Sequence, residues 1–297
     1  MKKKYTSTTR EWVNTLVWAG LIAIVFRSFL LEPFNIPSGS MIPTLQVGDH
    51  IFVTKWSYGY SRNSFPFGSW NMWDGRFLSH EPKTGDVIVF RKPNDTVDYV
   101  KRLIGLPGDT VQMVGGRLYI NGQMVERENP RPYIIANLAK RLRSAGFQRM
   151  NTKTGDVMII KGNKIYVNNR PADFNYTIEY KPDRLCDISP VECMVIDATE
   201  WTEILPNGVR HSIVEISDDR DYDNTPLFKV PDRHFFMMGD DRDLSRDSRA
   251  DVGFVPRDNI LGRVWFVWYS HNYYAPLVML WTWPEKLRWD RIGMGIN

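Results

Sequence analysis

Two serines separated by a single glycine lie in the stretch NIPSGSMIPTL, residues 35–45. A nucleophilic serine needs an exposed hydroxyl on a rigid backbone, with donors placed for the oxyanion that forms. Prolines on both sides restrict this turn, and Gly39 allows a conformation that other residues cannot adopt. If Ser40 is the nucleophile, its own N–H and the Ser38 hydroxyl are close enough to bind that oxyanion. A solvated turn is the simpler interpretation of a lone serine, but the paired hydroxyls favour acyl-transfer chemistry.

A serine nucleophile needs a general base, and none of the five histidines lies in a recognisable catalytic motif. The chain also has no G-x-S-x-G elbow. A lysine can act instead if burial keeps it neutral, because a pKa of about 10.4 leaves only about one lysine in 2,500 uncharged at pH 7. Lys101, in DYVKRLIGLPGD, and Lys55, in IFVTKW, both have apolar neighbours. These residues alone leave both lysines as candidates, and an ordinary strand lysine is the simpler interpretation of each.

A third chemically rich stretch is MMGDDRDLSRDSRADVGFVP, residues 237–256, in which five aspartates and three arginines alternate with two serines. A charged surface loop is the simpler interpretation. Opposed charges can also form a rigid network that holds a small hydroxyl against an active site. The arginines Arg242, Arg246 and Arg249 would compete with a metal ion for the aspartates, so we expect no metal and no cofactor.

The N-terminus predicts a membrane anchor. Basic residues lie within residues 2–10, and residues 12–31 are nearly all apolar. Twenty residues make a helix of about 30 Å, the thickness of the bilayer core, and Arg27 near its end can extend its charge to the headgroups. A cleavable signal peptide would have a shorter apolar core, and a buried soluble helix would have polar residues at helical spacing. The basic tail should stay in the cytoplasm, which places the remainder outside.

This location bears on the two cysteines, Cys186 and Cys193, which lie close together in CDISPVEC. Their spacing does not fit a zinc site, and an oxidising compartment would preserve a disulfide between them. The formal charge of +4 is spread without a long basic run, so nucleic acid is not an expected partner.

Beyond the anchor, the sequence is dominated by β-branched and aromatic runs bounded by turn residues, which predicts a mostly β structure. One short amphipathic helix is predicted over residues 133–147. Residues 108–123 and 155–170 align at an offset of 47, as two hairpins with the same turn chemistry or as a duplicated hairpin. The aromatic stretches 64–77 and 276–289 fit either a membrane interface or ordinary core packing.

Three of these stretches, in order, resemble the bacterial type I signal peptidases (leader peptidases), a family of serine–lysine proteases. Residues 27–59 look like the family's serine box and the segment after it, 98–109 its lysine box, and 235–256 its Gly-Asp box. The ending LRWDRIGMGIN is also similar. The resemblance covers residues 27–125 and 230–297, and residues 126–230 would correspond to the family's variable second domain.

The resemblance implies Ser40 as nucleophile, Lys101 as general base, Ser38 as an oxyanion donor, and Ser245 as a hydrogen-bond partner that orients the Lys101 amine. Five residues of the Gly-Asp box would support the site: Gly239, Asp240, Arg242, Asp247 and Arg249. Five others would line shallow pockets for small substrate side chains: Phe34, Ile36, Leu45, Tyr99 and Val100.

The chain departs from the family pattern at Asp241 and Leu244, where the family usually has asparagine. A negative charge at Asp241 would raise the pKa of the lysine unless an arginine screens it. The family also often has two N-terminal spans, and here one is predicted.

We therefore predict a mainly β fold: an antiparallel β catalytic core with an inserted second β-rich domain, preceded by one N-terminal transmembrane helix. The predicted divisions are a cytoplasmic tail (1–11), the transmembrane helix (12–31), the first part of the core (32–125), the insertion (126–230) and the second part of the core (231–297).

The predicted function is that of a membrane-anchored serine endopeptidase that removes signal peptides from exported preproteins after small residues at −1 and −3. The expected location is the bacterial inner membrane, with the catalytic domain on the outer face, in contact with lipid and near the secretion translocon. A dedicated serine–lysine peptidase for a narrow substrate set, of the pilin or conjugation type, is one alternative. A non-catalytic β-rich membrane adaptor is another, and a self-cleaving repressor is disfavoured by the anchor.

Overall fold

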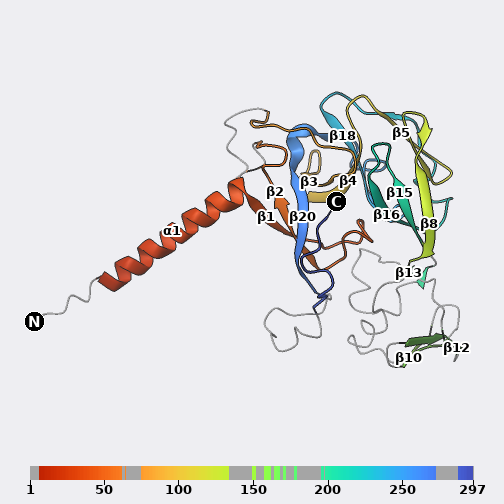
Figure 1. The fold of residues 1–297 in the computed structure, drawn as a ribbon, viewed down its shortest axis with the longest axis horizontal. Helices are drawn as coiled ribbons and strands as arrows, with labels where there is room; N and C mark the ends of the chain where they lie inside the picture. The colour runs from red at the N-terminus through yellow and green to blue at the C-terminus, as the bar shows by residue number, and fades with distance from the viewer. Residues whose placement is uncertain are drawn as a thin grey trace, which may run out of the picture.

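A long helix projects from a body of β-sheets in the computed structural model (Figure 1). The structure describes residues 7–61, 64, 75–133, 198–271 and 287–296, with the backbone of short strands between residues 149 and 196. Among these residues, helix and strand follow the predicted pattern: one apolar helix at the N-terminus and a mainly antiparallel β body.

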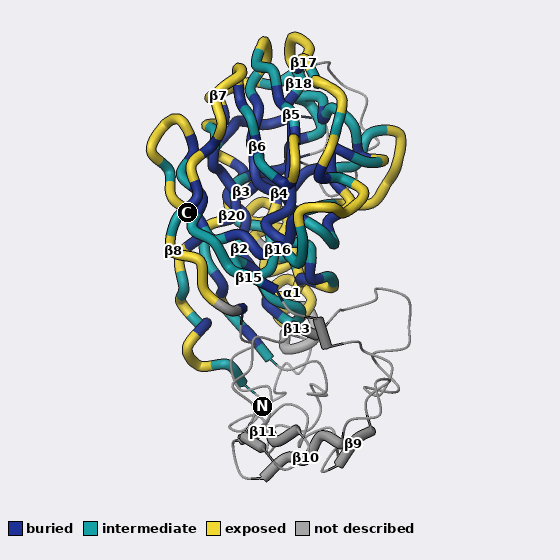
Figure 2. The backbone as a smooth tube through the Cα atoms, turned by 90° about the vertical axis from the view of Figure 1, so that its right-hand side faces the viewer, coloured by how far each residue is buried: buried dark blue, intermediate teal, exposed yellow. Residues whose placement is uncertain are grey.

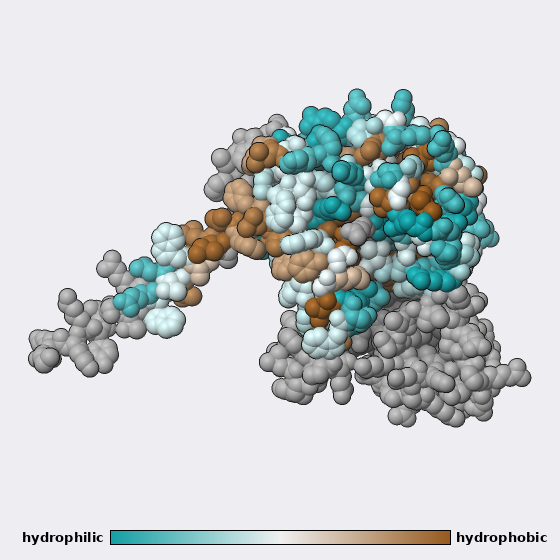
Figure 3. All heavy atoms as spheres, in the orientation of Figure 1, coloured by the Kyte–Doolittle hydropathy of each residue, from teal (hydrophilic) through white to brown (hydrophobic). Residues whose placement is uncertain are grey.

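Helix α1 (Ser7–Phe29) is, among the described residues, the one helix long and apolar enough to cross a membrane, judged by length and composition. Figure 3 shows apolar side chains gathered along the part of α1 nearest the β body. The helix ends at Phe29, two residues before the predicted end of the span at Leu31, and the Phe29 carbonyl accepts a hydrogen bond from the Tyr60 hydroxyl at 2.7 Å. Leu31 then begins strand β1 (Leu31–Asn35).

A seven-stranded antiparallel sheet, in the order β1-β2-β20-β3-β4-β18-β19, forms the centre of the body. After β1, its strands in chain order are β2 (Asp49–Thr54), β3 (Val87–Arg91), β4 (Asp98–Gly105), β18 (His234–Met238), β19 (Val255–Pro256) and, after the 3-10 helix η3 (Arg257–Asn259), the long β20 (Ile260–Ser270). The sheet therefore joins residues 31–105 to residues 234–270, which, apart from Leu31, lie within the two predicted parts of the catalytic core.

Both faces of this sheet are covered, which explains its long apolar runs. In β3, Val87 and Val89 pack with Leu45 in one buried cluster, whereas Ile88 and Phe90 pack in another with residues of β18. Figure 2 shows the buried backbone concentrated where β3, β4, β5 and β6 cross the middle of the body.

Two smaller sheets extend the body. One has the order β17-β5-β6-β7, and the other β16-β15-β8. Their strands are β5 (Thr110–Val114), β6 (Arg117–Ile120), β7 (Gln123–Met124), β8 (Glu126–Pro132), β15 (Thr199–Ile204), β16 (Arg210–Glu215) and β17 (Phe228–Lys229). The sheet of β8, β15 and β16 is drawn from the predicted insertion, and the exact division into domains stays a prediction.

The two segments that align at an offset of 47 form matching hairpins. In the first, Val114 pairs with Arg117, and in the second Lys161 pairs with Lys164, which is the same register 47 residues later. The second copy lies in a sheet of β9 (Arg149–Asn151), β10 (Val157–Lys161), β11 (Lys164–Val167) and β12 (Arg170–Pro171). A further pair is formed by β13 (Thr177–Ile178) and β14 (Val195–Ile196).

Several predictions fall on residues that the structure does not describe. The helix predicted over residues 133–147 lies outside the described residues after Tyr133, and so does the pair Cys186 and Cys193. The aromatic stretches 64–77 and 276–289 are described only at their ends.

Candidate active site

The Ser40 hydroxyl and the Lys101 amine meet in the structure. Ser40 lies in the turn between β1 and β2, where Ile42 N–H donates to the Gly39 carbonyl at 2.8 Å, and Lys101 lies in the middle of β4. The Lys101 Nζ donates a hydrogen bond to Ser40 Oγ across a separation of 61 residues in the sequence. A serine and a lysine in direct contact form the pair that a serine–lysine mechanism requires.

Lys55, the other lysine candidate, has a different role. Its Nζ forms an ion pair with Glu32 Oε2 at 2.8 Å and also donates to the carbonyl of Ser64. Burial lowers the pKa of Lys55, although Glu32 raises it in part. None of the five histidines, all of which are described, hydrogen-bonds to Ser40. The structure therefore brings Lys101, and not Lys55 or a histidine, to the serine.

The surroundings of Lys101 favour its neutral form. Lys101 is only 2% exposed. Burial lowers the pKa of Lys101 from 10.5 to about 8, although the nearby carboxylates of Asp247, Asp241 and Asp240 partly oppose this shift. A pKa near 8 leaves about one-tenth of the lysines neutral at pH 7, compared with about one in 3,000 at the ordinary value. The amine is therefore suited to accept a proton from Ser40.

An aspartate–arginine pair supports the loop opposite Ser40. Asp247 binds Arg249 through both of its oxygens at 2.9 Å and accepts the Gly239 N–H at 2.9 Å. Arg249 also donates to the carbonyl of Arg242 at 2.7 Å. Burial raises the pKa of Asp247, but Arg249 outweighs it and holds that pKa below its ordinary value. These contacts fit the predicted structural roles of Gly239, Asp247 and Arg249.

A second buried ion pair ties this loop to the turn that carries Ser40. Arg102 binds both oxygens of Asp240 at 2.8 Å, and the Thr44 hydroxyl donates to Asp240 at 2.5 Å. Arg242 pairs with both oxygens of Glu203, also fully buried. Burial raises the pKa of Asp240, but the Arg102 guanidinium brings it below its ordinary range. Asp240 and Arg242 thus hold the loop through long-range ion pairs.

Gly239 allows the closest approach in the site. A Cβ at this position would lie 2.1 Å from Ser245 Oγ and 2.4 Å from the Ser40 carbonyl oxygen. The predicted hydrogen bond between Ser245 and the Lys101 amine is not formed: Ser245 is buried against Gly239, and its hydroxyl has no hydrogen-bond partner among the described residues. The amine donates to Ser40 instead.

A cavity of about 400 Å³ opens beside Ser40 and Lys101. Four of the residues predicted to line a pocket do so: Phe34, Ile36, Tyr99 and Val100. Leu45 does not, because it is completely buried in the core beneath the turn. The cavity is further lined by Ser38 and by residues that the sequence did not single out as pocket residues: Asn35, Pro37, Ile51, Val89, Val97, Asp98, Leu244 and Arg246.

The C-terminal segment fixes the far end of the serine turn. Arg291 Nε donates to Asp49 at 3.0 Å, and Arg291 Nη2 donates to the Thr44 carbonyl at 2.9 Å. Arg288 binds Asp49 at 3.0 Å and the Val47 carbonyl at 2.8 Å. The C-terminal segment therefore holds this turn from outside the sheet.

Several of these supporting residues were missed by sequence reasoning. Arg102 could have been noticed as a charged residue inside an apolar strand, next to Lys101. Thr44, Glu203 and His211 carry no local signal. His211 lies between Glu203 and Asp240, with separations of 3.3 and 3.4 Å, and only the folded chain brings the three together.

Replacing Asp241 by asparagine is expected to shift the pH dependence of catalysis by the Ser40–Lys101 pair toward lower pH. Burial raises the pKa of Asp241 to about 7, and its negative form stabilises the Lys101 ammonium. The Leu244 N–H donates to Asp241 at 3.2 Å. Asparagine keeps an oxygen that can accept this hydrogen bond, but it removes the negative charge. The apparent pKa in kcat/KM should fall by up to about one unit, with a gain of less than about tenfold at neutral pH. Superimposable pH–rate profiles of variant and wild type would contradict this coupling.

Comparison with known proteins assigns the class first. The family model described as "Signal peptidase, peptidase S26" matches residues 9–153 and 148–269. Signal peptidase I of Rickettsia typhi is 35% identical over 276 residues, which cover 90% of this chain and 83% of the relative. Signal peptidase I of Rickettsia prowazekii is 34% identical over 272 residues, covering 89% and 81%. A crystal structure of a signal peptidase I from Enterococcus faecalis aligns with 23% identity and a TM-score of 0.27, over 62% of this chain and 97% of that one.

The chain belongs to the signal peptidase (peptidase S26) family, which is a family of serine proteases. The resemblance seen in the three sequence boxes is thereby confirmed, and the chain is an enzyme of this class.

Proposed function

We propose that this protein cleaves signal peptides from exported preproteins with a Ser40–Lys101 dyad, at the surface of a membrane in which α1 is embedded. The observation that carries the proposal is the hydrogen bond between the Lys101 amine and the Ser40 hydroxyl, beside a cavity that can receive a peptide. Family membership supports the substrate class, since its curated relatives are named signal peptidase I.

The chemistry follows from this contact. Neutral Lys101 accepts the Ser40 proton as Oγ attacks the scissile carbonyl, and the lysine then protonates the leaving amine. The ester that remains on Ser40 is hydrolysed by water that the same lysine activates. Within the described part of the chain, no hydrogen bond occupies the Ser40 N–H or the Ser38 hydroxyl, so both can donate to the oxyanion.

The cavity favours small side chains on the acyl side of the scissile bond. Apolar residues from β1, β2, β3 and β4, which are strands of one sheet, form a large part of its walls. A volume of about 400 Å³ must hold several residues of an extended peptide, so it leaves little space for large side chains. We therefore assign it to the small residues at −1 and −3.

The helix supports a location at a membrane. Most of the α1 side chains are exposed and apolar, including Trp12, Leu16 and Ile22, and a bilayer would cover them. With the basic tail in the cytoplasm, the β body lies on the outer face. There it contacts lipid and receives preproteins as they leave the translocon.

The function is tested with the full-length protein in detergent and a preprotein that carries alanine at −1. Cleavage at the predicted site is expected, and phenylalanine at −1 should reduce kcat/KM at least about 100-fold because the pocket cannot accept it. The same substitution placed well inside the mature part is the control and should have no effect. Equal cleavage of both preproteins would refute the assignment of the cavity, and cleavage of one preprotein among several unrelated ones would indicate a dedicated processing peptidase.

A further inference from the structure

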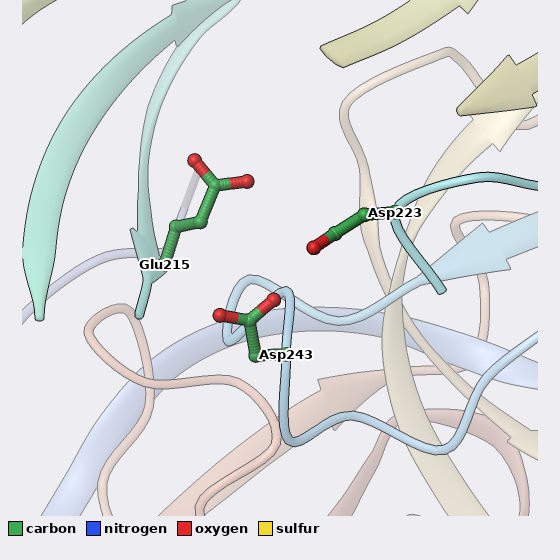
Figure 4. A group of neighbouring side chains, drawn as sticks. All are labelled: Glu215, Asp223 and Asp243. Atoms are coloured by element: carbon green, nitrogen blue, oxygen red, sulfur yellow. The ribbon is translucent and has the colours of Figure 1, made fainter. Parts of the chain in front are cut away.

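Three carboxylates that take no part in the dyad meet beside the loop between β18 and β19 (residues 239–254), here called the Gly-Asp loop. Glu215 lies at the end of β16, Asp223 in the loop that follows, and Asp243 in the loop between β18 and β19. One oxygen from each lies within 4.8 Å of the other two. Figure 4 shows the three side chains converging on a common space from three separate segments.

One oxygen of each carboxylate is held by the protein. Arg127 donates to Glu215 Oε2 at 2.6 Å. Backbone N–H groups hold the aspartates: that of residue 220 donates to Asp223 Oδ2 at 2.6 Å, and those of residues 216 and 217 donate to Asp243 Oδ2 at 2.6 and 3.1 Å. The three side chains are therefore fixed in direction before any ligand binds.

The other oxygen of each carboxylate is buried and has no hydrogen-bond partner among the described residues: Glu215 Oε1, Asp223 Oδ1 and Asp243 Oδ1. Glu215 is 4% exposed and Asp223 is 0% exposed. Buried carboxylate oxygens without a partner are costly, because they lose their water and gain nothing in return. The three carboxylates also lie close enough to repel one another when charged, which indicates room for a positive partner among them.

The arginines of the Gly-Asp loop, which the sequence suggested as competitors of a metal ion, do not supply such a partner, because they form ion pairs elsewhere. Arg242 pairs with Glu203, Arg246 with Asp251, and Arg249 with Asp247. The loop between Glu215 and Asp223 instead adds exposed acidic residues at 218, 219 and 221, which make the local potential more negative.

We propose that Glu215, Asp223 and Asp243 form a binding site for a hard divalent cation, with Ca²⁺ as the ion that fits. Carboxylate oxygens are the ligands that Ca²⁺ prefers, and Ca–O distances of about 2.3–2.6 Å let one ion join oxygens up to about 5 Å apart. Mg²⁺, at about 2.1 Å, joins oxygens only up to about 4 Å apart, so it tolerates a narrower range of separations than Ca²⁺. Water completes the coordination of either ion.

Such an ion would support the active site from outside. Asp243 directly precedes Leu244 and Ser245 in the chain. Val214, the neighbour of Glu215, is hydrogen-bonded to the same loop. The Val214 N–H donates to the Asp240 carbonyl at 2.9 Å, and the Val214 carbonyl accepts the Arg242 N–H at 2.9 Å. Bound Ca²⁺ would cross-link β16, the loop after it and the Gly-Asp loop. It has no direct part in peptide cleavage, so the site does not depend on the proposed function.

The test uses full-length protein in detergent, freed of divalent ions with a chelator and titrated with CaCl₂. We expect a single site with a dissociation constant of about 10⁻⁵–10⁻³ M by calorimetry, and a rise in the midpoint of thermal unfolding. Asp223→Asn should weaken Ca²⁺ binding at least about tenfold, because it removes one charged ligand. The control is Asp221→Asn, which removes the same charge from an exposed position of the same loop and should change the affinity less than about twofold.

Two results would overturn the proposal. One is the absence of a Ca²⁺-dependent rise in the wild-type unfolding midpoint beyond that produced by NaCl at equal ionic strength. In that case the carboxylates are stabilised by protons, and the midpoint should instead rise as the pH is lowered through 7, since burial raises the pKa of Glu215 to about 7. The other is an equal loss of affinity in both variants, which would reveal a diffuse effect of loop charge. If Asp223→Asn does not fold, the first result is read from the wild type alone, and a loss of affinity of about tenfold or more in Asp221→Asn takes the place of the second.

Discussion

Replacement of Lys101 by methionine is expected to reduce kcat/KM by about 10³- to 10⁴-fold at every pH, because the variant lacks the group that accepts the Ser40 proton. In the wild type, kcat/KM should rise with pH and level off above an apparent pKa near 8, the value to which burial lowers the pKa of Lys101. The matched control is Lys55→Met, which removes a buried lysine that pairs with Glu32 and does not contact Ser40. The Lys55→Met variant should show the same pH dependence of kcat/KM as the wild type.

Measurements of the unfolding of Lys101→Met show whether its loss of activity comes from the missing amine or from a damaged fold. The pKa of Lys101 is lower in the folded chain, about 8, than the ordinary 10.5, so the unfolded chain binds more protons between these values. Wild-type stability should therefore rise with pH across this window, whereas Lys101→Met should lack this rise. Below pH 8 the variant should be more stable than the wild type by up to about 3 kcal/mol, since it buries no charge. A Lys101→Met variant that keeps its activity would contradict the role of Lys101 as general base. An unfolded Lys101→Met variant would contradict the expected gain in stability.

Replacement of Ser40 by alanine should reduce kcat/KM at least about 10⁴-fold, because no other described hydroxyl contacts the Lys101 amine. Ser38→Ala tests the adjacent hydroxyl. It should lower kcat about 10²-fold with little change in KM, as expected for the loss of a donor that acts mainly on the oxyanion.

Both serine variants should keep the wild-type unfolding midpoint within a few degrees, since each removes one partly exposed oxygen. Rates are measured on the same preprotein under single-turnover conditions. A Ser40→Ala enzyme with substantial activity would exclude Ser40 as the nucleophile. Equal losses from the two variants would show that Ser38 has more than an accessory role.

The sequence predicted those features that depend on local pattern. The apolar run of residues 12–31 predicted the helix, and β-branched runs bounded by turn residues predicted strands such as β2, β3 and β20. The hairpin repeat was visible because the same turn residues recur 47 positions apart. Local pattern works here because helix and strand place side chains with fixed periods.

Local pattern could not decide between Lys55 and Lys101, since both lie in apolar runs and only the fold shows which amine reaches Ser40. The Thr44–Asp240 contact joins residues 196 positions apart, and neither carries a signal for the other. Leu45 was assigned to the pocket by resemblance, but its side chain lies beneath the turn rather than in the cavity. Such errors are expected where one turn presents some side chains to the core and others to the substrate.

The short connection between α1 and β1 has a geometric consequence. Glu32 lies within 2.7 Å of Arg27, in the last turn of the helix, and within 2.8 Å of Lys55 in the β body, so it links the two units. Phe34, five residues after the helix ends, already lines the cavity, and five extended residues span about 17 Å. With α1 in a bilayer, as proposed above, the active site lies at a fixed distance from the membrane surface. A peptide bond that does not reach this distance is not cleaved, even if the residues around it fit the pocket.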